Sequence, residues 1–193
     1  MGALVVGITG SPASGKSSFA MELSHRLNGA EIIELNEIVK KDKLVVDHES
    51  DGTAIADLQR LSYAVREKLR HAKTTVVLVG HLLPELGIRT DITIVVRASL
   101  SQLRLRMKKR GYSPKKISEN IVCEAIDYCG CKSDGKAREV YEVETQKEKA
   151  AMISYIVRIS SGSPAKKPAI RDINKMKELE LLIRNGLITN ITP

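Results

Sequence analysis

The chain has 193 residues, enough for one α/β domain with its own hydrophobic core. Aromatic residues make up 3% of it and Trp is absent, too few for the ring-stacking surfaces of single-strand nucleic-acid binders. The formal net charge of +8 favours an anionic partner. Nucleotides need only a local basic site, so the excess weakly favours RNA or a ribonucleoprotein, and a basic protein without such a partner is equally open.

The cysteines predict a reducing environment. There are three of them, Cys123, Cys129 and Cys131, and an odd number fits free thiols. No second ligand pair lies at a zinc-site spacing, so we expect thiols that bind no metal. No apolar run reaches the length of a membrane span and no basic leader precedes the first apolar stretch, which predicts a cytoplasmic protein without membrane contacts.

An apolar run that starts at Leu4 ends in a glycine-bounded loop, and an amphipathic helix follows to about Leu27. The loop has the pattern Gly10, four residues, Gly15-Lys16-Ser, which is typical of the phosphate loop of nucleoside triphosphate-binding proteins. A chance glycine-rich turn would not need the strand before it or the helix after it. We expect Lys16 to reach the β and γ phosphates and to act in catalysis, and the Ser17 hydroxyl to bind Mg²⁺. The residues expected to bind ATP here are Gly10, Ala13, Ser14, Gly15, Lys16, Ser17 and Ser18.

The rest of the chain alternates short apolar runs with segments of helical periodicity. Further strands are expected over residues 30–35, 74–79, 91–96 and 140–145. Helices are expected over 37–41, 54–71, 100–110, 114–128 and 148–159, with loops over 43–52 and 130–135 and a linker over 160–164. Asn36, Ser99 and Asp172 are predicted helix caps, the last for a helix that ends near Arg184. This alternation predicts a parallel sheet with helices on both faces.

In such sheets ligands bind beyond the carboxyl ends of the strands, where Gly10, Asn36, His81 and Arg97 would converge. The chain has no room for a separate motor domain and no Asn-Lys-x-Asp stretch for reading guanine, so small kinases remain. These close a basic lid that excludes water. The lid candidates are Arg104, Arg106, Lys108, Lys109 and Arg110. We expect Lys108 and Lys109 to form a solvated face and Arg110 to be the functional residue.

Three stretches carry a family resemblance: residues 7–17, Val-Gly-His at 79–81, and Arg-Gly-Tyr-Ser-Pro-Lys-Lys-Ile-Ser-Glu-Asn-Ile-Val-Cys-Glu-Ala at 110–125. Together they resemble the atypical adenylate kinases of isoenzyme-six type and their archaeal relatives, over about residues 4–147. The resemblance implies a three-layer α/β P-loop nucleoside monophosphate kinase fold. It also implies transfer of the γ-phosphoryl group of ATP to AMP, with Mg²⁺ as the cofactor.

The resemblance also assigns segments. It implies a kinase domain over 1–159 with a monophosphate-binding region at about 33–56 and a lid at about 109–119, followed by a linker and helical tail over 160–193. The arginine matching Arg110 contacts ATP in the family, as does a basic residue for which Lys147 is the nearest match and Lys149 competes. The residues expected to bind the monophosphate are Asn36, Asp51 and Arg97.

Members of the family also act as ATPases in maturation of the small ribosomal subunit, bound to a ribosomal protein near the ribosomal RNA. That role is the alternative to a kinase. One departure concerns the metal: family members of the eukaryotic type carry Asp-x-His where this chain has Val79-Gly-His81. Water, or Asp47, Asp51 or Asp91, would replace the missing carboxylate. His81 is expected to position an attacking water or the acceptor, unless it is only a polar residue at a strand end.

Overall fold

The structure is a computed structural model and describes residues 3–27, 29–48, 54–169 and 173–188. Its central sheet has five parallel strands in the order β2-β5-β1-β6-β7. These strands are β1 (Val5–Thr9), β2 (Glu31–Glu34), β5 (Val76–Val79), β6 (Thr90–Val96) and β7 (Ala137–Val143). Because β1 is the middle strand, the loop after it emerges at the centre of the carboxyl edge of the sheet.

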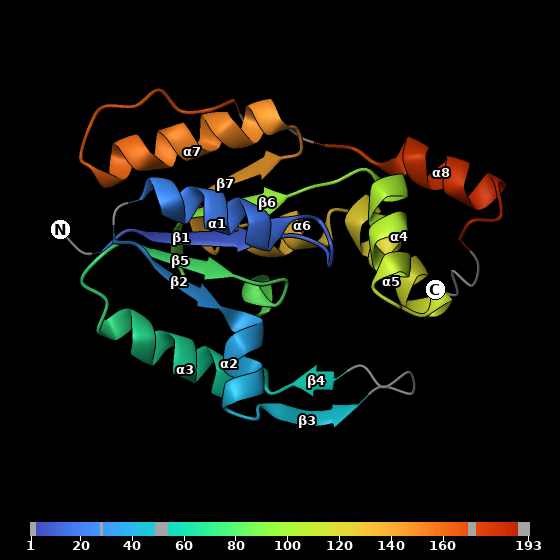
Figure 1. Ribbon diagram of the computed structural model, residues 1–193, viewed down its shortest axis with the longest axis horizontal. Coiled ribbons are helices and arrows are strands. Elements are labelled where there is room, and N and C mark those ends of the chain that lie inside the picture. The colour runs from blue at the N-terminus through green and yellow to red at the C-terminus, as the bar shows by residue number, and fades with distance from the viewer. Residues whose placement is uncertain (1–2, 28, 49–53, 170–172, 189–193) are drawn as a thin grey trace.

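Helices cover both faces of this sheet, which confirms the predicted three-layer α/β fold (Figure 1). The helices are α1 (Lys16–Arg26), α2 (Leu35–Lys41), α3 (Leu58–Arg70), α4 (Leu100–Lys109), α5 (Pro114–Ala125), α6 (Tyr128–Ser133), α7 (Gln146–Ser160), α8 (Met176–Arg184) and the short 3-10 helix η1 (Leu83–Glu85). Within the described ranges, no helix combines the length and the apolar character needed to cross a bilayer.

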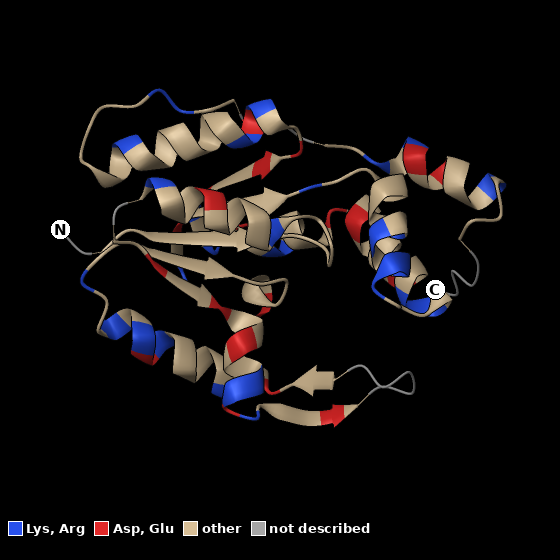
Figure 2. Ribbon diagram, viewed as in Figure 1, with Lys and Arg blue, Asp and Glu red and all other residues tan. Residues whose placement is uncertain are grey.

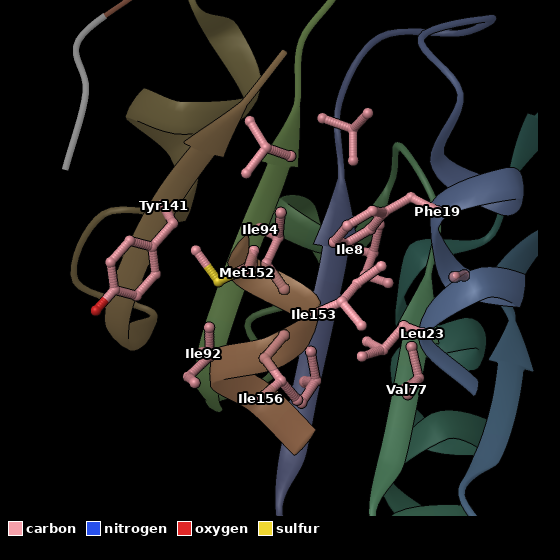
Figure 3. Packing of buried hydrophobic residues seen from close by; sticks show 14 of the residues in the cluster. Ile8, Phe19, Leu23, Val77, Ile92, Ile94, Tyr141, Met152, Ile153 and Ile156 are labelled. Atoms are coloured by element: carbon pink, nitrogen blue, oxygen red, sulfur yellow. The ribbon is translucent and has the colours of Figure 1, made fainter. Parts of the chain in front are cut away.

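The first core cluster lies between the sheet and the pair α1 and α7. Ile8 and Ile94 from neighbouring strands meet Leu23 of α1 and Ile153 of α7, and all four are almost completely buried (Figure 3). β-Branched side chains suit strands that are covered on both faces, because they pack well on a pleated surface. This packing fixes the start of α1, and with it the loop that connects α1 to β1.

A second cluster covers the opposite face, where Leu61 and Val65 of α3 pack on Val76 and Leu78 of β5. A third cluster stands beside the sheet and joins α4, α5 and α8 to the loop after β1. Its buried members include Met107, Ile121, Leu179 and Leu182, with Ala13 from the loop. The helices on either side of the predicted lid therefore pack directly against the predicted phosphate loop.

The segment expected to be a loop followed by a helix forms a hairpin instead. Residues 45–48 are strand β3 (Val45–His48), which pairs antiparallel with β4 (Ala54–Ala56), and β4 occupies the first residues of the predicted helix. The helix begins only at Leu58, because the Asp57 side chain caps it by accepting a hydrogen bond from the Arg60 amide. Pairing between two short strands, which no periodicity reveals, decided this segment.

Two predicted helix ends also differ. Asn36 is not a cap: it lies inside α2, whose N-cap is Glu34 without a side-chain hydrogen bond. The helix predicted to Tyr128 ends at Ala125, since Asp127 adopts a left-handed φ of 52°. Asp127 then caps α6 (Tyr128–Ser133), so the first residues of the predicted loop 130–135 are helical. Asp172 lies outside the described residues. The Ser99 cap is confirmed, because its side chain accepts from the Gln102 amide.

Candidate nucleotide-binding site

The loop between β1 and α1 has the backbone that its glycines predict. Gly10 and Gly15 have φ values of 135° and 105°, and Ala13 also adopts a left-handed φ of 66°. A Cβ on Gly10 would lie 2.3 Å from the Val96 carbonyl oxygen, so only glycine fits where the loop crosses the end of β6. The loop amides can thus curve around an anion in front of the helix, where the helix dipole also favours negative charge.

Hydroxyl groups of the loop are available to a ligand. Ser14 is 1% exposed, and its Oγ has no hydrogen-bond partner among the described residues. A buried hydroxyl without a partner is costly, so an incoming phosphate oxygen would satisfy it. Ser17 and Ser18 lie in the first turn of α1 and are exposed. Bound nucleotide would therefore find both a cradle and a free hydroxyl at Ser17.

Lys16 points back into the loop. Its Nζ donates a hydrogen bond to the Ser11 carbonyl oxygen at 2.8 Å. The pKa of Lys16 is lowered to about 8, mainly by burial and also by the positive charge of Arg110, while the charges of Glu124 and Glu34 raise it. A desolvated ammonium group has a strong attraction for phosphate, which would replace the water that the lysine has lost.

His81 lies just beyond the end of β5, in the wall of a cavity of about 820 Å³. The cavity lies between α2, the β3–β4 hairpin and the start of α5, and its wall includes Pro12 of the loop. Burial lowers the pKa of His81 to about 4, followed by the charges of Lys16 and Lys116. The imidazole is therefore neutral at pH 7 and can donate one hydrogen bond and accept another.

The predicted lid, about residues 109–119, comprises the end of α4, the short connection to α5 and the first half of α5. Arg110 follows the last residue of α4, and Gly111, with φ 77°, turns the chain towards α5. Basic residues gather on α4 and at the start of α5, on the side of the molecule that carries the loop (Figure 2). Since the charge of Arg110 acts on Lys16 and that of Lys116 acts on His81, Arg110 lies near the loop and Lys116 lies near His81.

The two candidate lysines of α7 differ in their surroundings. Lys147 is exposed in the first turn of the helix. Lys149 is partly buried; burial and the charge of Arg106 both lower its pKa. Arg106 in turn donates a hydrogen bond to the Ala13 carbonyl oxygen of the phosphate loop at 3.2 Å. Lys149 is thus linked to the loop through the neighbouring Arg106. ATP contact by either lysine stays a prediction.

The three residues expected to bind the monophosphate have separate outcomes. Asn36 lines the cavity, as that prediction requires, and Asp51 lies outside the described residues. Arg97 is different, because its guanidinium is fully buried and bonded to the carboxylates of Glu124 and Asp127, and of Glu142. We correct its assignment to a structural role, since a cation already neutralised inside the fold has no donors left for a substrate phosphate.

The candidate metal carboxylates are also sorted by position. Asp91 lies at the start of β6 and accepts from the Val5 amide at 2.9 Å, at the opposite edge of the sheet from the loop, which removes it as a metal ligand. Asp47 is exposed in β3 and bonds to the amide of its neighbour His48. The described residues contain no group of three or more His, Cys, Asp or Glu that could hold a metal ion.

Sequence reasoning missed Glu34. It ends β2 at the carboxyl edge, and its charge raises the pKa of Lys16, so it faces the loop. Its place at the carboxyl end of a predicted strand was the signal in the sequence that could have identified it.

The cysteines are free thiols in the structure. Burial raises the pKa of Cys129 to about 11, so this thiol is protonated at pH 7.

Comparison with known proteins decides the family. Residues 6–127 match the model of the AAA domain family. A protein of Methanocaldococcus jannaschii named "Putative adenylate kinase" is 37% identical over 72% of this chain and 76% of its own length. One of the same name from Methanosarcina acetivorans is 34% identical over 74% of this chain and 77% of its own length. The chain belongs to this archaeal adenylate kinase family. The resemblance carried by residues 7–17 and 110–125 is thereby confirmed.

Solved structures agree on the fold of this P-loop kinase family. Shikimate kinase from Acinetobacter baumannii has a TM-score of 0.55 at 12% identity, covering 85% of this chain and 96% of that one. TT1252 from Thermus thermophilus has a TM-score of 0.52 at 17% identity, covering 86% of this chain and 100% of that one. At such identities the likeness shows the fold alone, because one superfold hosts many activities.

Proposed function

We propose that this adenylate kinase relative transfers the γ-phosphoryl group of ATP to a nucleoside monophosphate, with AMP as the foremost acceptor. The observation that carries the proposal is the cavity beside the phosphate loop, which shares Pro12 with it. Its volume of about 820 Å³ suits a second nucleotide rather than a single water. A loop for one set of phosphates and an adjoining cavity for an acceptor are what a transferase needs.

The lining of the cavity fits a nucleoside and a phosphate at different places. Apolar side chains come from α2 and the hairpin, among them Val39, Val45 and Ile55, and these can contact a base. Polar groups come from α2 and the lid side, namely Asn36, Lys40, Ser113, Lys116 and Asn120. A phosphate bound near Lys116 would lie close to His81, and hence close to the loop.

The chemistry would then consist of positioning and charge neutralisation. An ionised monophosphate oxygen needs no base, so the residues only have to hold it in line with the γ-phosphorus. Lys16 and the loop amides would bind the transferring group, and Arg110 would meet the charge that spreads over its oxygens. Neutral His81 would orient the acceptor without adding a further positive charge.

Magnesium fits this site as an ion held mainly by nucleotide and water. Ser17 is exposed at the start of α1, and Glu34 is close enough for its charge to act on Lys16. Mg²⁺ keeps several waters and takes few protein ligands at phosphate sites, which is consistent with the sparse donor set. When bound, it would neutralise charge on the β and γ phosphates.

The test is to measure ATP turnover by the purified protein with AMP, with other monophosphates and without acceptor. Formation of two ADP for each ATP and AMP consumed supports the kinase. Turnover that ignores AMP would contradict it. Lys16→Ala should abolish the reaction, whereas Lys73→Ala, an exposed lysine before β5 at the far edge of the sheet, should not change it.

The alternative of an assembly ATPase for the small ribosomal subunit rests on the net charge and on the family resemblance. No comparison supports a ribosomal protein or RNA as a partner, and no cavity or contact among the described residues favours one. The same turnover assay tests it, because ATP hydrolysis without acceptor would be that activity's first requirement.

A further inference from the structure

The phosphate loop is tied to a buried ion pair that the proposed reaction does not use. Ser11 Oγ donates a hydrogen bond to Glu124 Oε2 at 2.6 Å, across 113 positions of sequence. Glu124 Oε1 accepts from Arg97 Nε at 2.8 Å, and the Glu124 carbonyl oxygen accepts from Arg97 NH2 at 2.8 Å. Ser11, Glu124 and Arg97 are 3%, 2% and 1% exposed, so water does not compete for these bonds.

The Glu124 carboxylate is held rigidly by its own surroundings. Burial alone would lower the pKa of Arg97, but the charges of Glu124, Asp127 and Glu142 raise it above its ordinary value. Arg97 therefore stays charged and keeps Glu124 in one orientation, with a second weak donor in the Ala98 amide at 3.4 Å. A hydrogen bond from a hydroxyl to an ionised carboxylate is about twice as strong as one between neutral groups.

The other side of Ser11 faces the ligand. Its carbonyl oxygen accepts from Lys16 Nζ at 2.8 Å and from the Ser14 amide at 3.2 Å. A contact that holds Ser11 in place therefore also holds the turn of the loop and the position of the Lys16 ammonium group. The loop needs such fixing, because Ala13 holds a left-handed conformation that residues with a Cβ rarely adopt.

We propose that Glu124 is a positioning residue for the phosphate loop, which it pre-shapes for nucleotide by holding the Ser11 hydroxyl from α5. The proposal rests on the proposed function only in taking nucleotide phosphate as the ligand of the loop. A pre-shaped loop binds ground state and transition state alike, so loss of the tether should fall on affinity more than on the rate at saturation. The charge of Glu124 also raises the pKa of Lys16, which independently places the carboxylate next to the loop.

The sharpest test removes the tether and leaves the ion pair in place. Ser11→Ala deletes the hydroxyl while Arg97 still pairs with Glu124. We expect roughly a tenfold loss of affinity for ATP and ADP in direct titration, the size of one charge-assisted hydrogen bond. The rate at saturating ATP and the melting temperature should change far less. Ser62→Ala is the matched control. It removes a partly buried hydroxyl of α3 that donates a hydrogen bond to the Leu86 carbonyl oxygen at 2.9 Å, away from the phosphate loop.

A double-mutant cycle adds a second readout. Glu124→Gln should weaken nucleotide binding at least as much as Ser11→Ala, and combining the two should cost little more than Glu124→Gln alone. Wild-type affinity in Ser11→Ala overturns the proposal, as do additive losses in the cycle. If Glu124→Gln does not fold, the Ser11→Ala titration decides alone. If Lys16→Ala binds nucleotide with wild-type affinity, nucleotide does not bind at the phosphate loop, and the proposed function fails rather than the role of Glu124.

Discussion

Glu34 at the end of β2 is the register partner of Val79 at the end of β5. Partners in parallel strands project to the same face of the sheet, so a carboxylate lies one strand away from the position where the family resemblance predicts an aspartate. The charge of Glu34 reaches Lys16 in the loop. The neighbouring strand thus offers an acidic group that Val79 does not.

We predict that Glu34→Gln raises the Mg²⁺ concentration needed to tighten ATP binding by about tenfold, as for other outer-sphere partners of a metal. ATP affinity in the presence of a chelator should stay the same or increase slightly, because a negative charge near the loop is removed. A Mg²⁺ titration of ATP affinity measures both. Glu37→Gln, on the exposed side of α2, is the control, and an unchanged Mg²⁺ requirement in Glu34→Gln would contradict the prediction.

The low pKa of Lys16 predicts a pH dependence of binding. Because that pKa is about 8, the lysine is charged below pH 8 and neutral above it. Affinity for ADP should therefore fall roughly tenfold from pH 7 to pH 9, since the uncharged amine must first take up a proton. Lys16→Arg keeps its charge throughout this range and should flatten the profile. Equal slopes in both proteins would show that another group titrates.

His81 should make the fold less stable in mild acid. Its folded pKa of about 4 lies below the ordinary value of 6.5, so the unfolded chain binds more protons between these limits. The free energy of unfolding therefore has its full value above pH 6.5 and decreases as pH falls towards 4, by about 2 kcal/mol at pH 5. Urea unfolding at pH 7 and pH 5 measures the loss. His81→Gln should reduce it, while exposed His25→Gln should leave it as in the wild type.

Arg97 should matter for folding before it matters for any substrate. Arg97→Met would leave Glu124 buried without its cation, and breaking such a pair costs about 3–5 kcal/mol. The free energy of unfolding in urea measures the cost. Arg138→Met is the matched control, because Arg138 is 84% exposed and pairs with Asp91 at 3.5 Å, which predicts a change below about 1 kcal/mol. Unchanged stability in Arg97→Met would return Arg97 to the list of substrate-binding residues.

Much of this molecule follows from local patterns. The glycines and Lys16 of the loop, the buried β-branched strands and the alternation of strand and helix are short-range signals, and each matches its element in the structure. The hairpin of β3 and β4 gave no such signal, because its pairing joins Val45 to Ala56 and the segments are too short for a clear period. Local reasoning therefore placed a helix where a strand begins.

By itself, the sequence determined that a phosphate loop joins a strand of a parallel sheet to a helix, since strand, loop and helix all lie within the first 27 residues. Only the tertiary structure decided which charged residues face that loop. Arg97 has the residue type of a phosphate-binding group, yet it is neutralised by carboxylates in the interior, whereas the charges of Glu124 and Glu34 both act on Lys16. The reason is physical: a charge acts through distance and burial, and both depend on contacts between segments far apart in the chain.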